Sequence, residues 1–264
     1  MTRTTTLTLA VLVAAVTASA ALGAVQTRAI EYKDGDVVLE GYLAWDDALT
    51  GRRPGVLVVH EWWGLNDYPK QRARQLAEMG YVAFALDMYG KGLTATTREG
   101  AGALAGKLRN DRPLMRRRAA AGLEVLRKQD LVDPARIVAI GYCFGGTAVL
   151  ELARSGAEVA GVVSFHGGLD TPDPADARRI KAKVLVLHGA ADPGVPPEQV
   201  KAFQESMNAA GVDWHMVSYG GAVHAFTNPA AGNDPSKGAA YDAKADRRSW
   251  EAMKAFFAEV FAGR

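Results

Sequence analysis

The feature that most constrains the fold is a series of short, nearly continuous apolar runs along the chain. These runs lie at 55–60, 81–86, 137–141, 159–165 and 184–187, and a more alternating one follows at 214–219. Such runs are typical of parallel strands that are buried on both faces of a sheet. Segments with helical patterns separate them, at 68–79, 113–127, 146–154, 198–210 and 247–261. We therefore predict an α/β fold with a doubly wound, mostly parallel sheet and helices on both faces.

An antiparallel hairpin is expected before the parallel strands. Its strands would cover 29–32 and 37–45, with a turn at Asp34 and Gly35. No linker, repeat or low-complexity segment divides the chain that follows. The length suits one large domain as well as two small ones, and the unbroken pattern favours a single domain over residues 25–264.

Residues 1–24 have the pattern of a secretory signal peptide. A short basic start with Arg3 precedes an uncharged apolar stretch at 7–22, and Ala18-Ser19-Ala20 supplies small residues at cleavage spacing. An uncleaved membrane anchor is the alternative, but the stretch is shorter than the roughly 20 residues that span a bilayer. We predict export to the periplasm or the medium, with no stable membrane association after cleavage.

The charge distribution argues against a nucleic-acid partner. The formal net charge is only +2, and it is dispersed along the chain. The basic run Arg116-Arg117-Arg118 is interpreted as the solvated face of a helix, because arginine is seldom buried.

The segment Gly141-Tyr142-Cys143-Phe144-Gly145 lies between a predicted strand and a predicted helix. A sharp glycine-bounded turn in this setting is typical of a nucleophile elbow. Cys143 is the sole cysteine of the chain, so it cannot form an intramolecular disulfide. It is either a reactive thiol or a buried apolar filler.

An acid and a histidine follow later strands on the same predicted edge of the sheet, where ligands collect. The chain order Cys143, Asp192, His224 is that of nucleophile, acid and base in α/β-hydrolases. The histidine would exchange the proton of the thiol, and the carboxylate would orient the imidazole ring. The alternatives are a turn residue for Asp192, which precedes a proline, and a surface histidine for His224.

The other histidines fit structural roles. His60, His166 and His188 each close a predicted strand, so we expect them near the site without acting as the base. No two histidines have the spacing of a metal-binding pair, and we predict neither a metal nor another cofactor.

From about Ile30 to its end, the chain resembles the dienelactone hydrolase family of the α/β-hydrolase fold. The resemblance is carried by short motifs at 60–66 (HEWWGLN), 87–89 (DMY), 141–146 (GYCFGG), 189–192 (GAAD) and 224–226 (HAF). It implies that Glu61 approaches Cys143 and takes the thiol proton when substrate displaces it; the alternative is a solvent-exposed loop acid. The elbow predicts the Phe144 amide as one donor to the oxyanion, and the resemblance implies the Trp62 amide as the second.

The chain departs from the family pattern where a substrate carboxylate would be bound. Well-known members of the family have arginines at two positions that are Lys91 and Asn228 here, so this carboxylate clamp is weakened or missing. Tyr89 and Trp63 are further candidates for substrate contacts, although a tryptophan there could equally be packing.

The expected function is hydrolysis of small-molecule esters or lactones through an acyl-enzyme on Cys143. One alternative is a cysteine acyltransferase or peptidase with the same triad. Another is a non-catalytic binding protein that kept the fold, against which the complete set of reactive residues argues. A monomer is expected.

Overall fold

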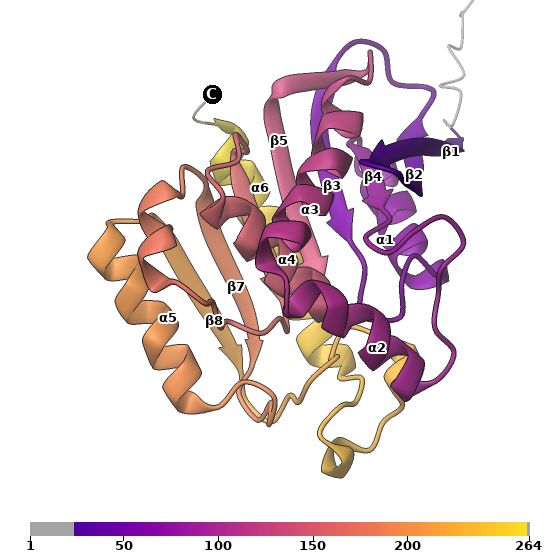
Figure 1. The fold of residues 1–264 in the computed structure, drawn as a ribbon. Coiled ribbons are helices and arrows are strands. Elements are labelled where there is room, and N and C mark those ends of the chain that lie inside the picture. The colour runs from indigo at the N-terminus through magenta and orange to yellow at the C-terminus, as the bar shows by residue number, and fades with distance from the viewer. Residues whose placement is uncertain (1–23, 263–264) are drawn as a thin grey trace, which may run out of the picture.

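A computed structural model describes residues 24–262. The strands are β1 Val25–Asp34, β2 Val37–Asp46, β3 Arg53–Val59, β4 Val82–Leu86, β5 Val132–Tyr142, β6 Gly161–Phe165, β7 Lys183–Gly189 and β8 Trp214–Tyr219. They form one sheet in the order β1-β2-β4-β3-β5-β6-β7-β8 (Figure 1). The β1–β2 and β2–β4 pairs are antiparallel and every later pair is parallel, which confirms the predicted mostly parallel sheet. The hairpin is confirmed too, but its two-residue turn lies at Gly35 and Asp36, one residue later than expected, because Asp34 still pairs with Val37 at the end of the strands.

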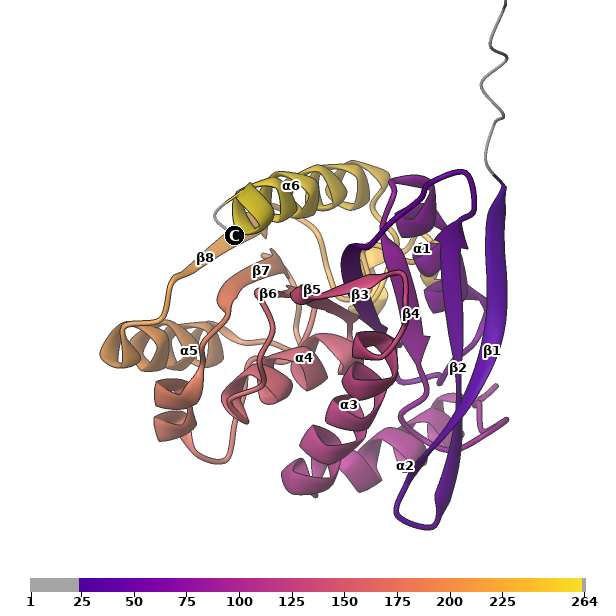
Figure 2. The ribbon, with the colours of Figure 1, turned by 90° about the horizontal axis from the view of Figure 1, so that it is seen from above.

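Helices cover both faces of this sheet, as the pattern predicts. They are α1 Asp67–Glu78, α2 Arg98–Arg109, α3 Arg112–Arg127, α4 Phe144–Arg154, α5 Pro197–Ala210 and α6 Ala243–Ala262, with short 3-10 turns at Pro174–Arg179, Pro229–Ala231 and Pro235–Lys237. Seen from above, α1 and α6 lie on one face, and α2, α3, α4 and α5 lie on the other (Figure 2). This arrangement is the α/β-hydrolase type of doubly wound sheet.

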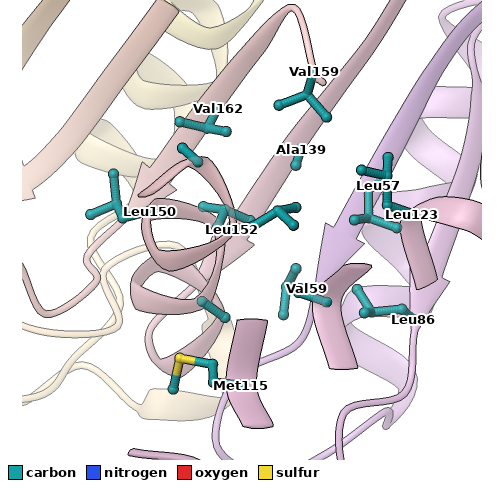
Figure 3. Close-up of a cluster of buried hydrophobic side chains, with 14 of the residues drawn as sticks. Leu57, Val59, Leu86, Met115, Leu123, Ala139, Leu150, Leu152, Val159 and Val162 are labelled. Carbon is teal, nitrogen blue, oxygen red and sulfur yellow. The ribbon is translucent and has the colours of Figure 1, made fainter. Parts of the chain in front are cut away.

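The two faces bury separate apolar cores, which explains why the strand sequences are continuously apolar. Successive strand residues point to opposite faces. In β3, Val56 and Val58 therefore pack in the core beneath α1 and α6. Leu57 and Val59 pack in the core beneath α2 to α5, where Figure 3 shows them with Leu123 of α3.

Helix α2 was not expected from the sequence. Its buried residues are Ala101, Ala105 and Leu108, so it buries little large apolar surface. It also contains glycine, the poorest helix former after proline. The sequence contains weak signals for the two ends of α2. Thr97 caps its start by accepting a hydrogen bond from the amide of Gly100, and basic residues occupy its last turn.

The expected solvated face at Arg116-Arg117-Arg118 is wrong for two of the three residues. Arg118 is buried and its Nε donates to Asp34 at 2.5 Å. Arg116 pairs with the fully buried Glu151 at 2.6 Å, and only Arg117 is largely exposed. The run binds α3 to the β1–β2 hairpin and to α4, because buried arginine requires carboxylate partners.

The predicted signal peptide lies almost wholly outside the described residues. Within residues 24–262, no helix combines the length and the apolar character that crossing a membrane requires.

Candidate active site

Cys143 occupies a strained turn between β5 and α4. Its φ is 55° and its ψ is −115°, a conformation that is uncommon for a residue with a side chain. The Cys143 amide donates to the carbonyl of Phe165 at 3.0 Å and to Nδ1 of His166 at 3.1 Å. These two bonds hold the turn in place at the carboxyl end of the sheet.

Two glycines make this turn possible by allowing a close backbone approach. A Cβ atom on Gly141 would lie 2.0 Å from the carbonyl oxygen of Gly145, and one on Gly145 would lie 2.2 Å from that of Val59. The start of α4 can therefore cross directly over β5 and β3 only with glycine at both positions. This requirement explains the glycine-bounded motif seen in the sequence.

The three residues of the proposed triad form one hydrogen-bonded chain. His224 Nε2 lies 3.0 Å from Cys143 Sγ, and His224 Nδ1 lies 2.8 Å from Asp192 Oδ2. The second oxygen of Asp192 accepts from the amide of Gly194 at 2.8 Å, so both carboxylate oxygens are held. The backbone of His224 is fixed in turn by hydrogen bonds to Gly238 and Ala240.

The charge distribution favours a protonated His224. Burial alone would lower the pKa of this imidazole, but the negative charges of Cys143 and Asp192 on either side raise it well above its ordinary value. An imidazolium between a thiolate and a carboxylate is the state in which sulfur can attack an electrophilic carbon.

Glu61 is a buried carboxyl, not a solvent-exposed loop acid. Only 3% of its surface is exposed, and Oε2 accepts a hydrogen bond from Asn228 Nδ2 at 2.6 Å. Burial raises the pKa of Glu61 to about 7, although Asn228, His224 and Arg72 partly oppose the shift. Glu61 can therefore gain or lose a proton near neutral pH.

The expected contact between Glu61 and Cys143 is not found among the hydrogen bonds of the described residues. Both residues line the same cavity, but the sulfur is bonded to His224 and the carboxylate to Asn228. In this arrangement, His224 and not Glu61 is the hydrogen-bond partner of the sulfur. The activating role that the resemblance implies for Glu61 stays a prediction.

The two residues expected to supply oxyanion donors are both close to the site: Phe144 directly follows Cys143, and Trp62 lines the same cavity as Cys143. Phe144 is the first residue of α4, where backbone amides lack intrahelical acceptors and the helix end carries partial positive charge. The loop with Trp62 is held by Tyr89, whose hydroxyl donates to the Trp62 carbonyl at 3.1 Å. Neither amide donates to a protein acceptor within residues 24–262.

Two buried histidines support this site, at the strand ends where the sequence placed them. His60 Nδ1 lies 2.5 Å from the carbonyl of Glu61, and its Nε2 accepts from the amide of Met88 at 3.1 Å. His166 contacts the Cys143 amide through Nδ1 and the Thr227 hydroxyl through Nε2, at 2.7 Å. Burial lowers the pKa of both histidines, so each is an uncharged ring. Each ring holds backbone groups near the site by hydrogen bonds.

A cavity of about 1000 Å³ opens above the nucleophile. Cys143, Asp192, His224 and Glu61 line it together with both tryptophans, Trp62 and Trp63. The rings of these tryptophans meet edge to face at 5.1 Å. The space is large enough for a drug-sized molecule.

Three residues predicted to touch substrate have other contacts in the structure. Lys91 does not line the cavity; it pairs with Glu31 and, at 3.3 Å, with Glu40. These two glutamates face each other across β1 and β2, so Lys91 bridges a like-charged pair.

Asn228 lines the cavity, but its side-chain amide is already hydrogen-bonded, because it donates to Glu61 and accepts from the backbone amide of Ala230. Tyr89 is buried beneath the loop at Trp62.

Sequence reasoning missed the cations of the cavity. Arg109 and Arg112, at the junction of α2 and α3, both line it, as do Arg98 and Lys237. The sequence signal that could have found Arg109 and Arg112 is the helix break at Asn110 and Asp111, where Asp111 accepts from the amide of Leu114 and caps α3.

Across residues 24–262, no group of three metal-ligating side chains could hold a metal ion.

The sheet order and the helices on both faces are those of the α/β-hydrolase fold, and the strained turn with the hydrogen-bonded Cys143, His224 and Asp192 lies at the edge of the sheet where ligands collect in open α/β folds. A model of the dienelactone hydrolase family matches residues 39–261. The chain belongs to the dienelactone hydrolase family, a family of hydrolases.

Individual relatives agree with this assignment. A dienelactone hydrolase-like promiscuous phosphotriesterase from metagenomic libraries is 44% identical, with a TM-score of 0.86 over 90% of this chain and 99% of that one. A protein of Aquifex aeolicus named as a carboxymethylenebutenolidase is 28% identical over 86% of this chain and 96% of its own length. A dienelactone hydrolase of Anabaena variabilis shares the fold at 24% identity, with a TM-score of 0.59 over 78% of this chain and 91% of that one.

Proposed function

We propose that this chain hydrolyses carboxylic esters or lactones through a thioester on Cys143. The observation that carries the proposal is the 3.0 Å contact between Cys143 Sγ and His224 Nε2 beneath an open cavity. A paired sulfur and imidazole, with a carboxylate behind the ring, is the arrangement that activates a thiol for acyl transfer.

The reaction would run in two halves. Cys143 Sγ attacks the carbonyl carbon, and the amides of Phe144 and Trp62 stabilise the resulting oxyanion. The carbon–oxygen bond then breaks while His224 gives its Nε2 proton to the leaving oxygen. In the second half, His224 takes a proton from water, the hydroxide attacks the thioester, and the acid leaves as the sulfur regains its negative charge.

The test is hydrolysis of p-nitrophenyl butyrate and a small aromatic lactone by the wild type and by Cys143→Ala. We expect the variant to lose at least about a thousandfold in kcat, as nucleophile removal does in related mechanisms. Intact-mass measurement after brief exposure should show an acyl adduct on the wild type alone. His215→Ala is the control, because His215 is exposed on β8. Full activity in Cys143→Ala would contradict the proposal.

Cleavage of phosphotriesters is a second candidate reaction. It is favoured by the 44% identity, over 90% of this chain, to a promiscuous phosphotriesterase. The sulfur would attack phosphorus, an aryloxide would leave, and water would release the phosphoryl group with the help of His224. Release of p-nitrophenol from diethyl p-nitrophenyl phosphate, dependent on Cys143, would establish this reaction; its absence would leave the esterase proposal intact.

We also propose that the enzyme acts after export, because of the signal-peptide pattern in residues 1–24. Expression of the full chain in a Gram-negative host, followed by sequencing of the N-terminus, tests this. A mature start near Val25 in the periplasmic fraction is expected, and soluble cytoplasmic protein that retains Met1 would contradict it.

A further inference from the structure

Two arginines at the junction of α2 and α3 line the cavity and differ in how they are paired. Arg112 is buried, and it binds Asp170 at 2.5 Å and the sulfur of Met115 at 3.8 Å. Its Nε, also buried, has no hydrogen-bond partner among the described residues. Arg109 is exposed to the cavity, with its guanidinium 6.0 Å from the centre of the Phe144 ring.

The charge of Arg109 is not balanced by a carboxylate. No ion pair joins Arg109, or the cavity residue Arg98, to an acidic residue of the segment 24–262. Arg112 instead pairs with Asp170 at 2.5 Å, and Lys237 lies 3.6 Å from Asp234. A cation without a partner on a cavity wall attracts an anionic group of the molecule that enters.

Arg109 lies close to the residue that follows the nucleophile. Phe144, whose ring it approaches, directly follows the nucleophile. Arg98, another cation of the cavity, begins α2 and lies about 16 Å from Arg109 along the helix, at 1.5 Å per residue. Among the two α2 arginines that line the cavity, Arg109 is the one that contacts the residue next to the nucleophile, and this contact is the reason for choosing it.

We propose that Arg109, with Arg112 beside it, binds a carboxylate at the far end of the acyl chain of the substrate. This rests on the proposed esterase function. His224 contacts the nucleophile and must reach the leaving oxygen, so in this proposal the leaving group lies beside His224. The acyl chain then extends away from His224, toward the Phe144 ring that Arg109 approaches. The substrate carboxylate would then be bound by Arg109 and Arg112 at the α2–α3 junction. Lys91 would not bind it, because its side chain does not line the cavity.

The test compares p-nitrophenyl valerate with mono-p-nitrophenyl glutarate, two esters with acyl chains of equal length and with or without a terminal carboxylate. The readout is the ratio of their kcat/KM values. We expect the wild type to favour the glutarate by about tenfold or more, as one charge-assisted hydrogen bond allows. Arg109→Met should abolish the preference, and Arg109→Lys should retain part of it, because lysine keeps the charge without the planar fork.

Lys107→Met is the matched control, because Lys107 is an exposed cation of the same helix that does not line the cavity. It should keep the wild-type ratio. An equal ratio in the wild type and Arg109→Met would overturn the proposal. So would an Arg109-dependent preference for 4-carboxyphenyl valerate, which carries its charge on the leaving group. Failure of the wild type to hydrolyse the neutral valerate would instead contradict the esterase function.

Discussion

Asn228 donates a hydrogen bond to Glu61 over 2.6 Å, and this places an uncharged partner beside a buried carboxyl. The orientation of the amide is fixed, since Asn228 Oδ1 accepts from the amide of Ala230 at 2.9 Å. An arginine at this position would hold Glu61 ionised. An amide stabilises the charge less, and burial therefore keeps the pKa of Glu61 at about 7.

This relationship predicts that Glu61 destabilises the fold at alkaline pH. The unfolded carboxyl ionises near pH 4.5 and the folded one near pH 7, so the unfolded state gains relative stability as the pH rises between these values. The full penalty, about 3 kcal/mol, is present above pH 7 and absent below pH 4.5. Glu61→Gln, which keeps an acceptor for Asn228, should exceed the wild type in free energy of unfolding at pH 8 but not at pH 4.5.

Urea unfolding at both pH values measures this difference. Glu198→Gln serves as the control, because Glu198 is exposed at the start of α5 and should show no such dependence on pH. A stability difference between Glu61→Gln and the wild type that stays constant from pH 4.5 to pH 8 would show that Glu61 ionises normally in the folded protein.

A second prediction concerns the contact between His224 and Cys143. Because neighbouring negative charges raise the pKa of His224, its imidazolium should stabilise the thiolate at neutral pH. His224→Ala should therefore slow alkylation of Cys143 by iodoacetamide at pH 7 by about tenfold or more. His215→Ala should react like the wild type. Equal alkylation rates in His224→Ala and the wild type would contradict an ion pair.

The fold could be predicted from the sequence because its signals are local. The glycines around Cys143 and the apolar runs each mark one element, and rules of strand order then bring Asp192 and His224 to the same edge as the cysteine. Short-range pattern and chain order were thus sufficient for the strands and for the central contacts of the site.

The remaining features depend on contacts between distant segments. Nothing around Lys91 in the sequence indicates that Glu31 and Glu40 will face each other in a hairpin and draw its side chain to the surface. Likewise, Arg118 looks like a surface residue until Asp34 is placed beside it. The pairing of Asn228 with Glu61, separated by 167 positions, could not be seen in any local motif.

A third prediction follows from the position of Lys91. Because this side chain bridges two surface glutamates and does not line the cavity, Lys91→Met should leave kcat/KM unchanged for neutral and anionic esters alike. Parallel assays of p-nitrophenyl valerate and mono-p-nitrophenyl glutarate check this. A loss of kcat/KM confined to the anionic ester would show that Lys91 does bind the substrate carboxylate.

The last prediction assigns a positioning role to His166. Burial lowers the pKa of this ring well below its usual range, so its neutral Nδ1 can accept the Cys143 amide while Nε2 donates to Thr227. His166→Leu removes the acceptor and should lower kcat by tenfold or more with little change in KM, about what a small misplacement of a nucleophile costs. His166→Asn should recover much of this loss, since asparagine supplies an acceptor and tolerates the positive φ of 39° found here. If His166→Asn proves as slow as His166→Leu while both unfold at the wild-type temperature, the acceptor is not what positions Cys143.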